Sequence, residues 1–397
     1  MTAPSVGADQ FDFTYLDELR RVADPEADDV VANYIDGEIG VHQGKLMTAL
    51  IAHGANTTDE EDAPLRGFVT ARPALPDWTE PAMVERGQEI FAEYVAQFGL
   101  GLWMASIPAG YAAAKGAEVL THTTRLVSDA RRRFLETGQF IIDVMSPGAL
   151  EPDGRGSSAI RHVRLMHASA RHLLVHRDLP SGTCETCGHP FPNSHDFDVD
   201  TMGVPINQED LLGTLFTFSV VGLDVIDRAG IWLSPADKEA YIHAWNVVGH
   251  GMGIRDDLLP LDFADSTTVF RRIQEHTYAP SPAGTQLTAA AIEVMQELIG
   301  LKVLRGLPAA GIREYLGDDI ADLLEVPRAG AARLVFVPAR ALNRIASHAE
   351  RDSKLLCRAS AALGRRFFNG FLAYERQGAM RPEFELTDAI AKQLALR

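Results

Sequence analysis

The chain of 397 residues is 46% hydrophobic and 23% charged, which is typical of a globular protein and too apolar for a disordered one. Its 54 acidic residues outnumber 37 basic residues and give a net charge of −17. A field of this sign disfavours nucleic acid and anionic membrane surfaces as partners, but it is compatible with an uncharged, apolar substrate.

The cysteine content and the apolar stretches indicate where the protein resides. Cys184, Cys187 and Cys357 are too few for a disulfide framework and indicate a reducing compartment. The first residues lack the basic start, apolar run and cleavage site of a secretory signal. The most apolar stretch, 211–226, contains Asp224 and is predicted as a core helix. We therefore expect a cytoplasmic protein without stable membrane insertion.

The periodicity of apolar residues divides the chain into two parts. Residues 1–30 are acidic and weakly patterned, which predicts an irregular arm, and residues 1–80 are assigned to this arm and to peripheral helices. From about residue 80 the apolar period is near 3.6, so residues 81–397 are predicted as one helical domain. For residues 334–337 a short strand and a helix both remain open.

Capping and breaking residues predict the first two helices of that domain. One helix is expected over residues 126–145, because a Ser-Pro-Gly sequence follows it directly. The next is expected over residues 159–176, with Ser157 or Ser158 as its N-cap. Each of these helices is long enough to present a full face to a core.

Two further helices carry similar signals. Asn207 is the expected N-cap of a helix over residues 207–228 that ends at Gly230. Ser234 and Pro235 begin the next helix, since proline at the first helical position loses no hydrogen bond. Successive long helices joined by short loops predict an all-α fold, a single large helical bundle.

The helix over 126–145 combines polar and apolar residues on one face. Arg133, Glu136, Thr137 and Phe140 align there at spacings of three and four. Polar side chains within an apolar stripe are costly unless they line a cavity or satisfy one another. The alternative is a surface ion pair between Arg133 and Glu136, and the spacing alone does not separate the two readings.

The helix over 159–176 presents a histidine on an apolar face. Val163, His167, Ala170, Arg171 and Leu174 share this face. A neutral imidazole on a rigid helix is suited to be the axial ligand of a haem iron, and a nearby arginine can pair with a propionate. From spacing alone, a packed core histidine held by a hydrogen bond is the favoured alternative.

A Cys-x-x-Cys motif lies in the loop over residues 179–202. Cys184, Cys187, His189 and His195 have spacings that a structural zinc ion could use. A single such pair is a weak signal, however, and a free dithiol in a loop is the favoured alternative. No phosphate-binding glycine loop, GxSxG elbow or HExxH motif is present, which disfavours nucleotide hydrolases, esterases and zincins.

Several ordered segments resemble one known family. The segments RRRFLETGQFIIDVMSPGALEPDGRG, AIRHVRLMHASARH, MGVPINQEDLLGTLFTFSVVGLDVIDRAG and AWNVVGHGMGIRDDLLP are similar to the catalytic-domain pattern of rubber oxygenases (latex clearing proteins). The wider superfamily includes the membrane-bound oxygenase that cuts a prenyl chain in mycophenolic acid biosynthesis. The resemblance spans roughly residues 95–345 and implies an all-helical haem b protein.

The resemblance also implies roles for individual residues. It makes His167 the proximal ligand of the haem iron, with Arg171 four residues further on. It places Arg133 and Thr137 on the distal side. Members that cleave rubber carry a lysine directly before that threonine, where this chain has Glu136. This departure argues against a lysine-capped iron and against rubber itself as the substrate.

Three more residues complete the predicted site. The catalytic glutamate of the rubber enzymes has its nearest match in Glu118, which is displaced by one position. Arg164 and Phe140, on the helices of His167 and Arg133, are assigned to the cofactor-binding set together with His167 and Arg171.

These observations predict a haem b-dependent oxygenase that uses O2 on an apolar, isoprenoid- or terpenoid-like alkene inside the cell. A haem-binding sensor or carrier, or a catalytically altered family member, is the first alternative. A helical interaction protein with a zinc ion and no haem is the second.

Overall fold

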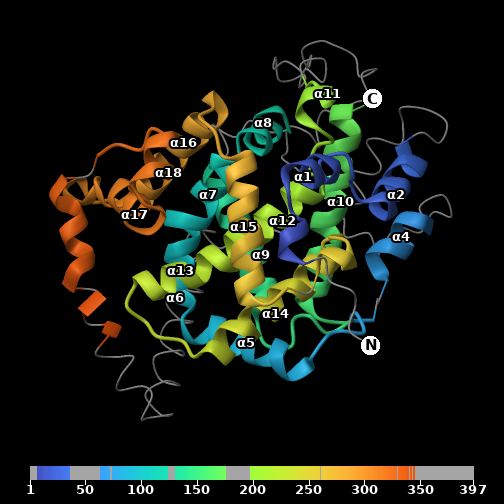
Figure 1. Cartoon of the computed structure of the whole chain (residues 1–397), viewed down its shortest axis with the longest axis horizontal. Coiled ribbons are helices and arrows are strands. Elements are labelled where there is room, and N and C mark those ends of the chain that lie inside the picture. The colour runs from blue at the N-terminus through green and yellow to red at the C-terminus, as the bar shows by residue number, and fades with distance from the viewer. Residues whose placement is uncertain are drawn as a thin grey trace.

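The chain is helical throughout the part that the structure describes (Figure 1). This computed structural model describes residues 7–35, 63–71, 74–123, 130–175, 197–259, 261–328 and 330–344, except 339 and 342. Within these ranges no strand forms, and an isolated antiparallel bridge joins Ala113 to Tyr278. The predicted all-α fold class is confirmed.

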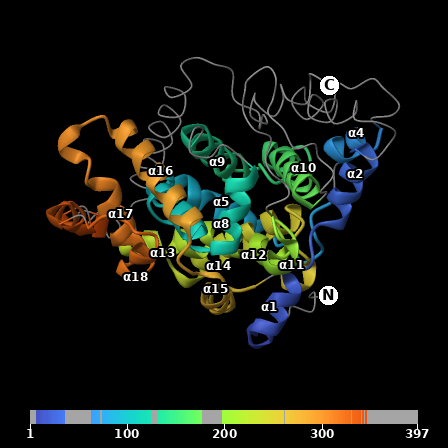
Figure 2. The same ribbon diagram turned by 90° about the horizontal axis from the view of Figure 1, so that it is seen from above.

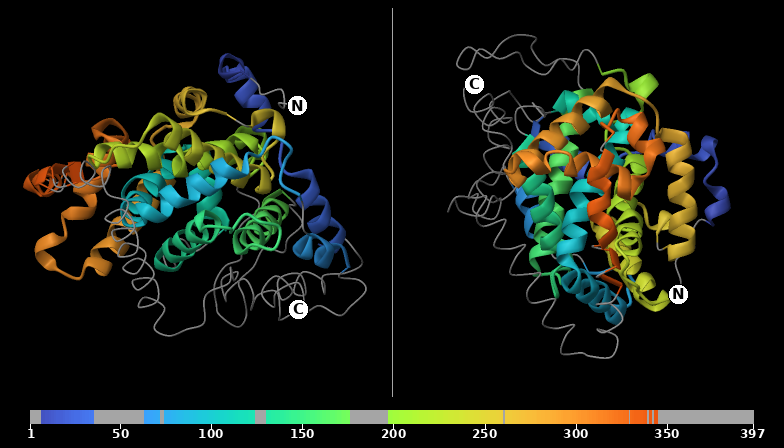
Figure 3. Two further views of the ribbon diagram at one scale, coloured as in Figure 1. Left: turned by 90° about the horizontal axis from the view of Figure 1, so that it is seen from below. Right: turned by 90° about the vertical axis from the view of Figure 1, so that its left-hand side faces the viewer.

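The long helices lie in three layers (Figures 2 and 3). One outer layer consists of α9 (Ala130–Met145) and α10 (Arg155–Val175). The middle layer contains α5 (Pro81–Glu93), α6 (Val95–Gly101), the π-helical turn η4 (Leu102–Ser106), α7 (Ile107–Ala112) and α8 (Ala114–Thr123). The other side is formed by α12 (Gln208–Phe218), α13 (Val220–Arg228) and α14 (Pro235–Gly251), with α15 (Phe263–Thr277) outside them.

Shorter elements close the two ends of this arrangement. At one end α2 (Pro25–Ile35) and α4 (Ala63–Thr70) pack against α10, with α1 (Phe13–Leu19) and α11 (Val199–Met202) nearby. At the opposite end lie α16 (Pro282–Ile299), α17 (Leu307–Leu316) and α18 (Asp318–Leu323). The 3₁₀ turns are η1 (Ala8–Gln10), η6 (Asp256–Leu258), η7 (Lys302–Leu304) and η8 (Gly330–Val335).

Helix α10 begins earlier than predicted. It starts at Arg155 rather than at residue 159, and Ser157 does not cap it, because its hydroxyl donates to the carbonyl of Glu151 at 2.8 Å. At Gly156 a Cβ atom would lie 2.7 Å from the carbonyl oxygen of Asp143. The chain thus turns tightly after α9, which ends at Met145 as predicted, and α10 starts directly against it.

The predicted helix over 207–228 is divided in two. Asn207 caps α12 as expected, accepting from the backbone N–H of Asp210, and the chain leaves α13 through Gly230 at φ +85°. Ser219 separates the two helices, and its hydroxyl donates to the carbonyl of Leu215 at 2.9 Å. A serine hydroxyl bonded back in this way bends helices. The start of α14 at Ser234 and Pro235 is as predicted.

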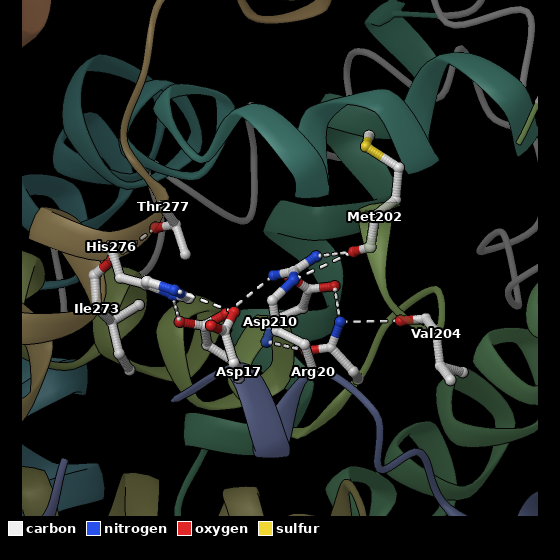
Figure 4. Close-up of polar contacts among 10 residues, drawn as sticks. Asp17, Arg20, Met202, Val204, Asp210, Ile273, His276 and Thr277 are labelled. Carbon is white, nitrogen blue, oxygen red and sulfur yellow. Dashed lines mark hydrogen bonds and ion pairs between the residues drawn. The ribbon is translucent and has the colours of Figure 1, made fainter. Parts of the chain in front are cut away.

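The prediction of an irregular arm over residues 1–30 is wrong. Its described residues, from 7 onward, form α1 and the first part of α2, and they bury apolar side chains: Phe11, Leu16, Leu19 and Ala27. It is held there by Arg20, which is 3% exposed and pairs with Glu209 at 2.9 Å and Asp210 at 3.0 Å. Figure 4 shows the Arg20 guanidinium directed at Asp210 and at the Met202 carbonyl, with His276 beside Asp17.

Two further expectations concern the end of the described chain and membrane crossing. Residues 334–337 form no strand: they lie at the end of η8 and in the helical turn after it.

No single described helix is long and apolar enough to cross a membrane. A pair bent by 81°, Pro81–Glu93 with Val95–Ala112, meets the length and composition requirement.

The contact between α5 and α14 requires a residue without a side chain. A Cβ atom on Gly87 would lie 2.5 Å from the Ala240 carbonyl oxygen and 2.8 Å from the Ala244 Cβ. We expect Gly87→Ala to lower the free energy of unfolding by about 1–3 kcal/mol, because two helix backbones must move apart. Gly110→Ala in α7 is the control, since nothing lies within 4 Å of its Cβ position. Equal stability of the two variants in denaturant melts would contradict this packing.

Candidate active site around His167

The histidine singled out by the sequence lies at the junction of three helices. His167 is on α10, Arg133 and Thr137 come from α9, and Tyr111 from α7. Helix α9 packs against α10 and α16, and α16 packs against α7. The π-helical turn η4 precedes α7, and such turns are frequent at functional sites.

The His167 side chain is deep in the protein yet keeps part of its surface accessible. Its Nδ1 atom is buried without a hydrogen-bond partner. Desolvation, with the positive charges of Arg171 and Arg133, lowers the pKa of His167 to about 3. The imidazole is therefore neutral at physiological pH, which is the state required of a metal ligand.

Arg171 lies one turn further along α10 and is 3% exposed. Its Nε donates to Asp28 Oδ1 at 2.7 Å and its Nη1 to the carbonyl of Ile206 at 3.1 Å. Its Nη2 atom is buried without a partner. Buried guanidinium nitrogens are normally hydrogen-bonded, so an unused donor at this depth indicates a place for an anionic group.

Arg133 supplies a second positive charge to the same region. It is half-buried on α9, and within the described chain it forms no ion pair. Its charge acts on both His167 and Tyr111. The alternative of a surface ion pair with Glu136 is not found among the described contacts, and the Arg133 charge lies close enough to His167 to lower its pKa.

Tyr111 is a residue that the sequence analysis missed. Burial raises the pKa of its hydroxyl to about 12, against the opposing effect of Arg133. The hydroxyl is therefore a neutral donor beside the Arg133 guanidinium. The only signal in the sequence is an isolated aromatic residue among small ones, in PAGYAAAKG, and such a residue is as easily explained by core packing.

The other predicted residues of α9 lie on the same helix stretch. Thr137 is half-buried one turn after Arg133, and Phe140 is 8% exposed and part of the apolar core. Glu136, directly before Thr137, is half-buried as well. Phe134 on the same helix, and Val163 one turn before His167 on α10, are buried parts of the main apolar core.

Two predicted residues are not brought to His167 by any contact found in the structure. Glu118 is half-buried on α8, where Thr121 donates to its carboxylate at 3.4 Å. Arg164 is directed at α2 instead, with Nε 2.5 Å from Asp24 Oδ2 and Nη2 2.7 Å from Glu26 Oε2. The cofactor-binding role of Arg164 and the catalytic role of Glu118 stay predictions.

The predicted zinc ligands lie outside the described residues. This applies to Cys184, Cys187, His189 and His195. Within the described ranges, no group of three or more His, Cys, Asp or Glu residues is arranged to hold a metal ion. A haem iron requires only one such ligand, because the porphyrin supplies the other nitrogen atoms.

The residues around His167 fit a haem. The imidazole is neutral and its Nδ1 has no partner, Arg171 holds an unused buried donor, and Arg133 lacks an ion-pair partner among the described residues. Haem b carries an iron that accepts an imidazole and two propionates that accept from guanidinium groups. An iron would suit the neutral imidazole and a propionate would suit the unused Nη2 of Arg171, and Arg133 remains available for a further polar group.

Comparisons with known proteins identify the family of the chain. The chain matches the profile of the family described as "ER-bound oxygenase mpaB/B'/Rubber oxygenase, catalytic domain" over residues 88–347. It is 26% identical over 316 residues to the rubber oxygenase of Streptomyces sp. (strain K30), covering 76% of this chain and 70% of that protein. The solved structure of the latex clearing protein LCP in the closed state has a similar fold, with a TM-score of 0.63 at 19% identity over 96% of this chain and 91% of that one. The family match extends over more than half of the sequence and includes His167, Arg133 and Arg171. The chain therefore belongs to the mpaB/rubber oxygenase catalytic-domain family.

Proposed function

We propose that this protein is a haem-dependent oxygenase that holds the iron through His167 and oxidises an apolar alkene with O2. Membership of an oxygenase family supports the reaction class. The observation that carries the cofactor assignment is the neutral imidazole of His167, deep in the protein and without a hydrogen bond at Nδ1. A core histidine kept for packing alone is normally hydrogen-bonded, as His162 is to the Ser158 carbonyl at 2.8 Å.

Each residue of the site has a defined task in this proposal. His167 would bind the haem iron, and the unused Nη2 of Arg171 would donate to a propionate. When bound, haem b supplies the dioxygen chemistry. Arg133, Thr137 and the neutral hydroxyl of Tyr111 donate hydrogen bonds to small polar groups beside the cofactor.

The buried apolar residues on the same two helices, α9 and α10, guide the choice of substrate class. Phe134, Phe140 and Val163 are buried and belong to one continuous apolar cluster. A hydrocarbon gains free energy on entering such surroundings, whereas a charged substrate would lose its hydration. We therefore assign an isoprenoid- or terpenoid-like alkene. Glu136 stands where the rubber-cleaving members carry lysine, which favours a substrate other than rubber and lets a carboxylate exchange a proton.

The exchange of lysine for Glu136 also favours a second candidate, a haem sensor or carrier that does not turn over. The two candidates differ in oxygen consumption. We expect the dithionite-reduced protein, exposed to O2, to consume it in the presence of a terpenoid alkene. Stable haem binding without alkene-dependent consumption would support the sensor or carrier instead.

The ligand assignment predicts the effect of removing the imidazole. We expect His167→Ala to lose the Soret band of the purified protein, because the substitution removes the proposed iron ligand. His162→Ala on the same helix is the matched control and should keep the band, since its Nδ1 is bonded to Ser158. Circular dichroism shows whether each variant keeps its helices. A folded His167→Ala variant with full haem content would disprove the assignment.

The depressed pKa of His167 predicts how the haem-free protein responds to acid. Above pH 6.5, folded and unfolded chains both carry a neutral imidazole. Below pH 6.5 the unfolded chain binds a proton that the folded one binds only near pH 3, so the free energy of unfolding falls. Between pH 7.5 and pH 5 this loss is about 2 kcal/mol.

The variant His167→Leu removes this proton, so its stability should fall less over the same range. Urea unfolding of both haem-free proteins at the two pH values measures the difference. Identical pH dependence of wild type and variant would show that His167 is not desolvated in solution.

A further inference from the structure

The segment before the family-matched region supplies carboxylates to α10. Residues 88–347 match the family, whereas Asp24 and Asp28 lie before them, at the start of α2. Asp24 pairs with Arg164 at 2.5 and 2.8 Å, and Asp28 pairs with Arg171 at 2.7 Å. Helices α2 and α10 lie side by side, so two ion pairs connect them at successive positions (Figure 2).

The Arg171 guanidinium is held at two of its three nitrogen atoms. Asp28 accepts from Nε and the Ile206 carbonyl accepts from Nη1, which leaves only Nη2 unused. The two acceptors lie far apart in the chain, and together they fix the plane of the guanidinium group. The rotation that would bring Nη2 to either acceptor is therefore blocked.

Both acceptors are themselves fixed in place. The second carboxylate oxygen of Asp28 accepts from the backbone N–H of Asp24 at 3.3 Å. Ile206 has φ +54°, a conformation that a β-branched residue adopts only when its surroundings impose it. Two residues further on, the Gln208 side chain donates to the carbonyls of Ala23 and Gly253 at 2.8 and 2.9 Å, which anchors this part of the chain.

We propose that Asp28 is a positioning residue of the site: it fixes Arg171 so that Nη2 stays available to an anionic group bound beside His167. This inference rests on the proposed function, in which that group is a haem propionate. The Arg171 side chain is 4% exposed and stays charged in proteins, so without Asp28 it would be a buried cation with a single carbonyl acceptor. It would then turn toward another acceptor or water, and the anion site would be lost.

The neighbouring pair offers a matched control. Asp24→Asn weakens the pairing between α2 and Arg164, at the same helix interface, but the charges that act on His167 are those of Arg171 and Arg133. A purely structural role of α2 predicts similar effects for Asp24→Asn and Asp28→Asn. A positioning role predicts an effect on haem binding for Asp28→Asn alone.

The test is a haem titration of the haem-free full-length protein, followed in the Soret band, with thermal melts of the same samples. We expect Asp28→Asn to raise the haem dissociation constant about 10–100-fold, as loss of a supporting partner does at metal sites. Asp28→Glu should restore most of the affinity, because it returns the charge. Asp24→Asn should bind haem like wild type at a comparable loss of melting temperature.

Each other outcome has a defined meaning. Wild-type affinity in folded Asp28→Asn, or equal weakening by Asp24→Asn and Asp28→Asn, would overturn the positioning role. The positioning role would also be overturned if Asp28→Glu bound haem no more tightly than Asp28→Asn. Absence of haem binding by the wild-type protein, or wild-type binding by His167→Ala, would instead overturn the proposed function. If Asp28→Asn does not fold, the comparison of Asp28→Glu with Asp24→Asn decides.

Discussion

A neutral imidazole in the vicinity of two guanidinium groups is the constraint on which the site depends. Desolvation and the charges of Arg171 and Arg133 act in the same direction on His167, and together they keep a proton away from it. The same charges would repel each other in a dry interior, so this arrangement requires negative charge nearby. Asp28 provides it for Arg171, whereas Arg133 has no ion-pair partner in the described part of the chain. The unused donor of Arg171 and the unpaired charge of Arg133 would both be stabilised by an anionic group, and this is the physical reason for proposing a cofactor.

The packing of α9 against α10 determines where these charges lie. Gly156 allows the start of α10 to lie within contact distance of the Asp143 carbonyl near the end of α9. The end of one helix and the start of the next are therefore in direct contact. His167 and Arg171 then lie on successive turns of one rigid helix, with Arg133 on the other. Because these positions are fixed by backbone contacts rather than by loops, the imidazole is held in one place relative to both arginines.

The sequence predicted those features whose signals are local. The Ser-Pro-Gly exit from α9, the Asn207 cap, the Ser234-Pro235 start of α14 and the shared face of His167 and Arg171 depend on residues within a few positions of one another. The α10 start was misplaced because Ser157 bonds to Glu151 instead of capping. Tyr111 was missed, and residues 1–30 were predicted irregular, because their partners, such as Arg133 for Tyr111 and Glu209 for Arg20, lie far along the chain and no periodicity records them.

The carboxylate partners of α10 lie outside the profile-matched residues, although the fold of the latex clearing protein covers 96% of this chain. The family match begins at residue 88 and contains the imidazole and both arginines, yet the carboxylates that accept from Arg164 and Arg171 come from α2. A buried arginine is stable only with its counter-charge, so the catalytic region by itself lacks part of its own electrostatic balance. The N-terminal helices are therefore to be regarded as a component of the site, and an excised family region would be expected to lose the orientation of Arg171 before it loses the helices that carry it.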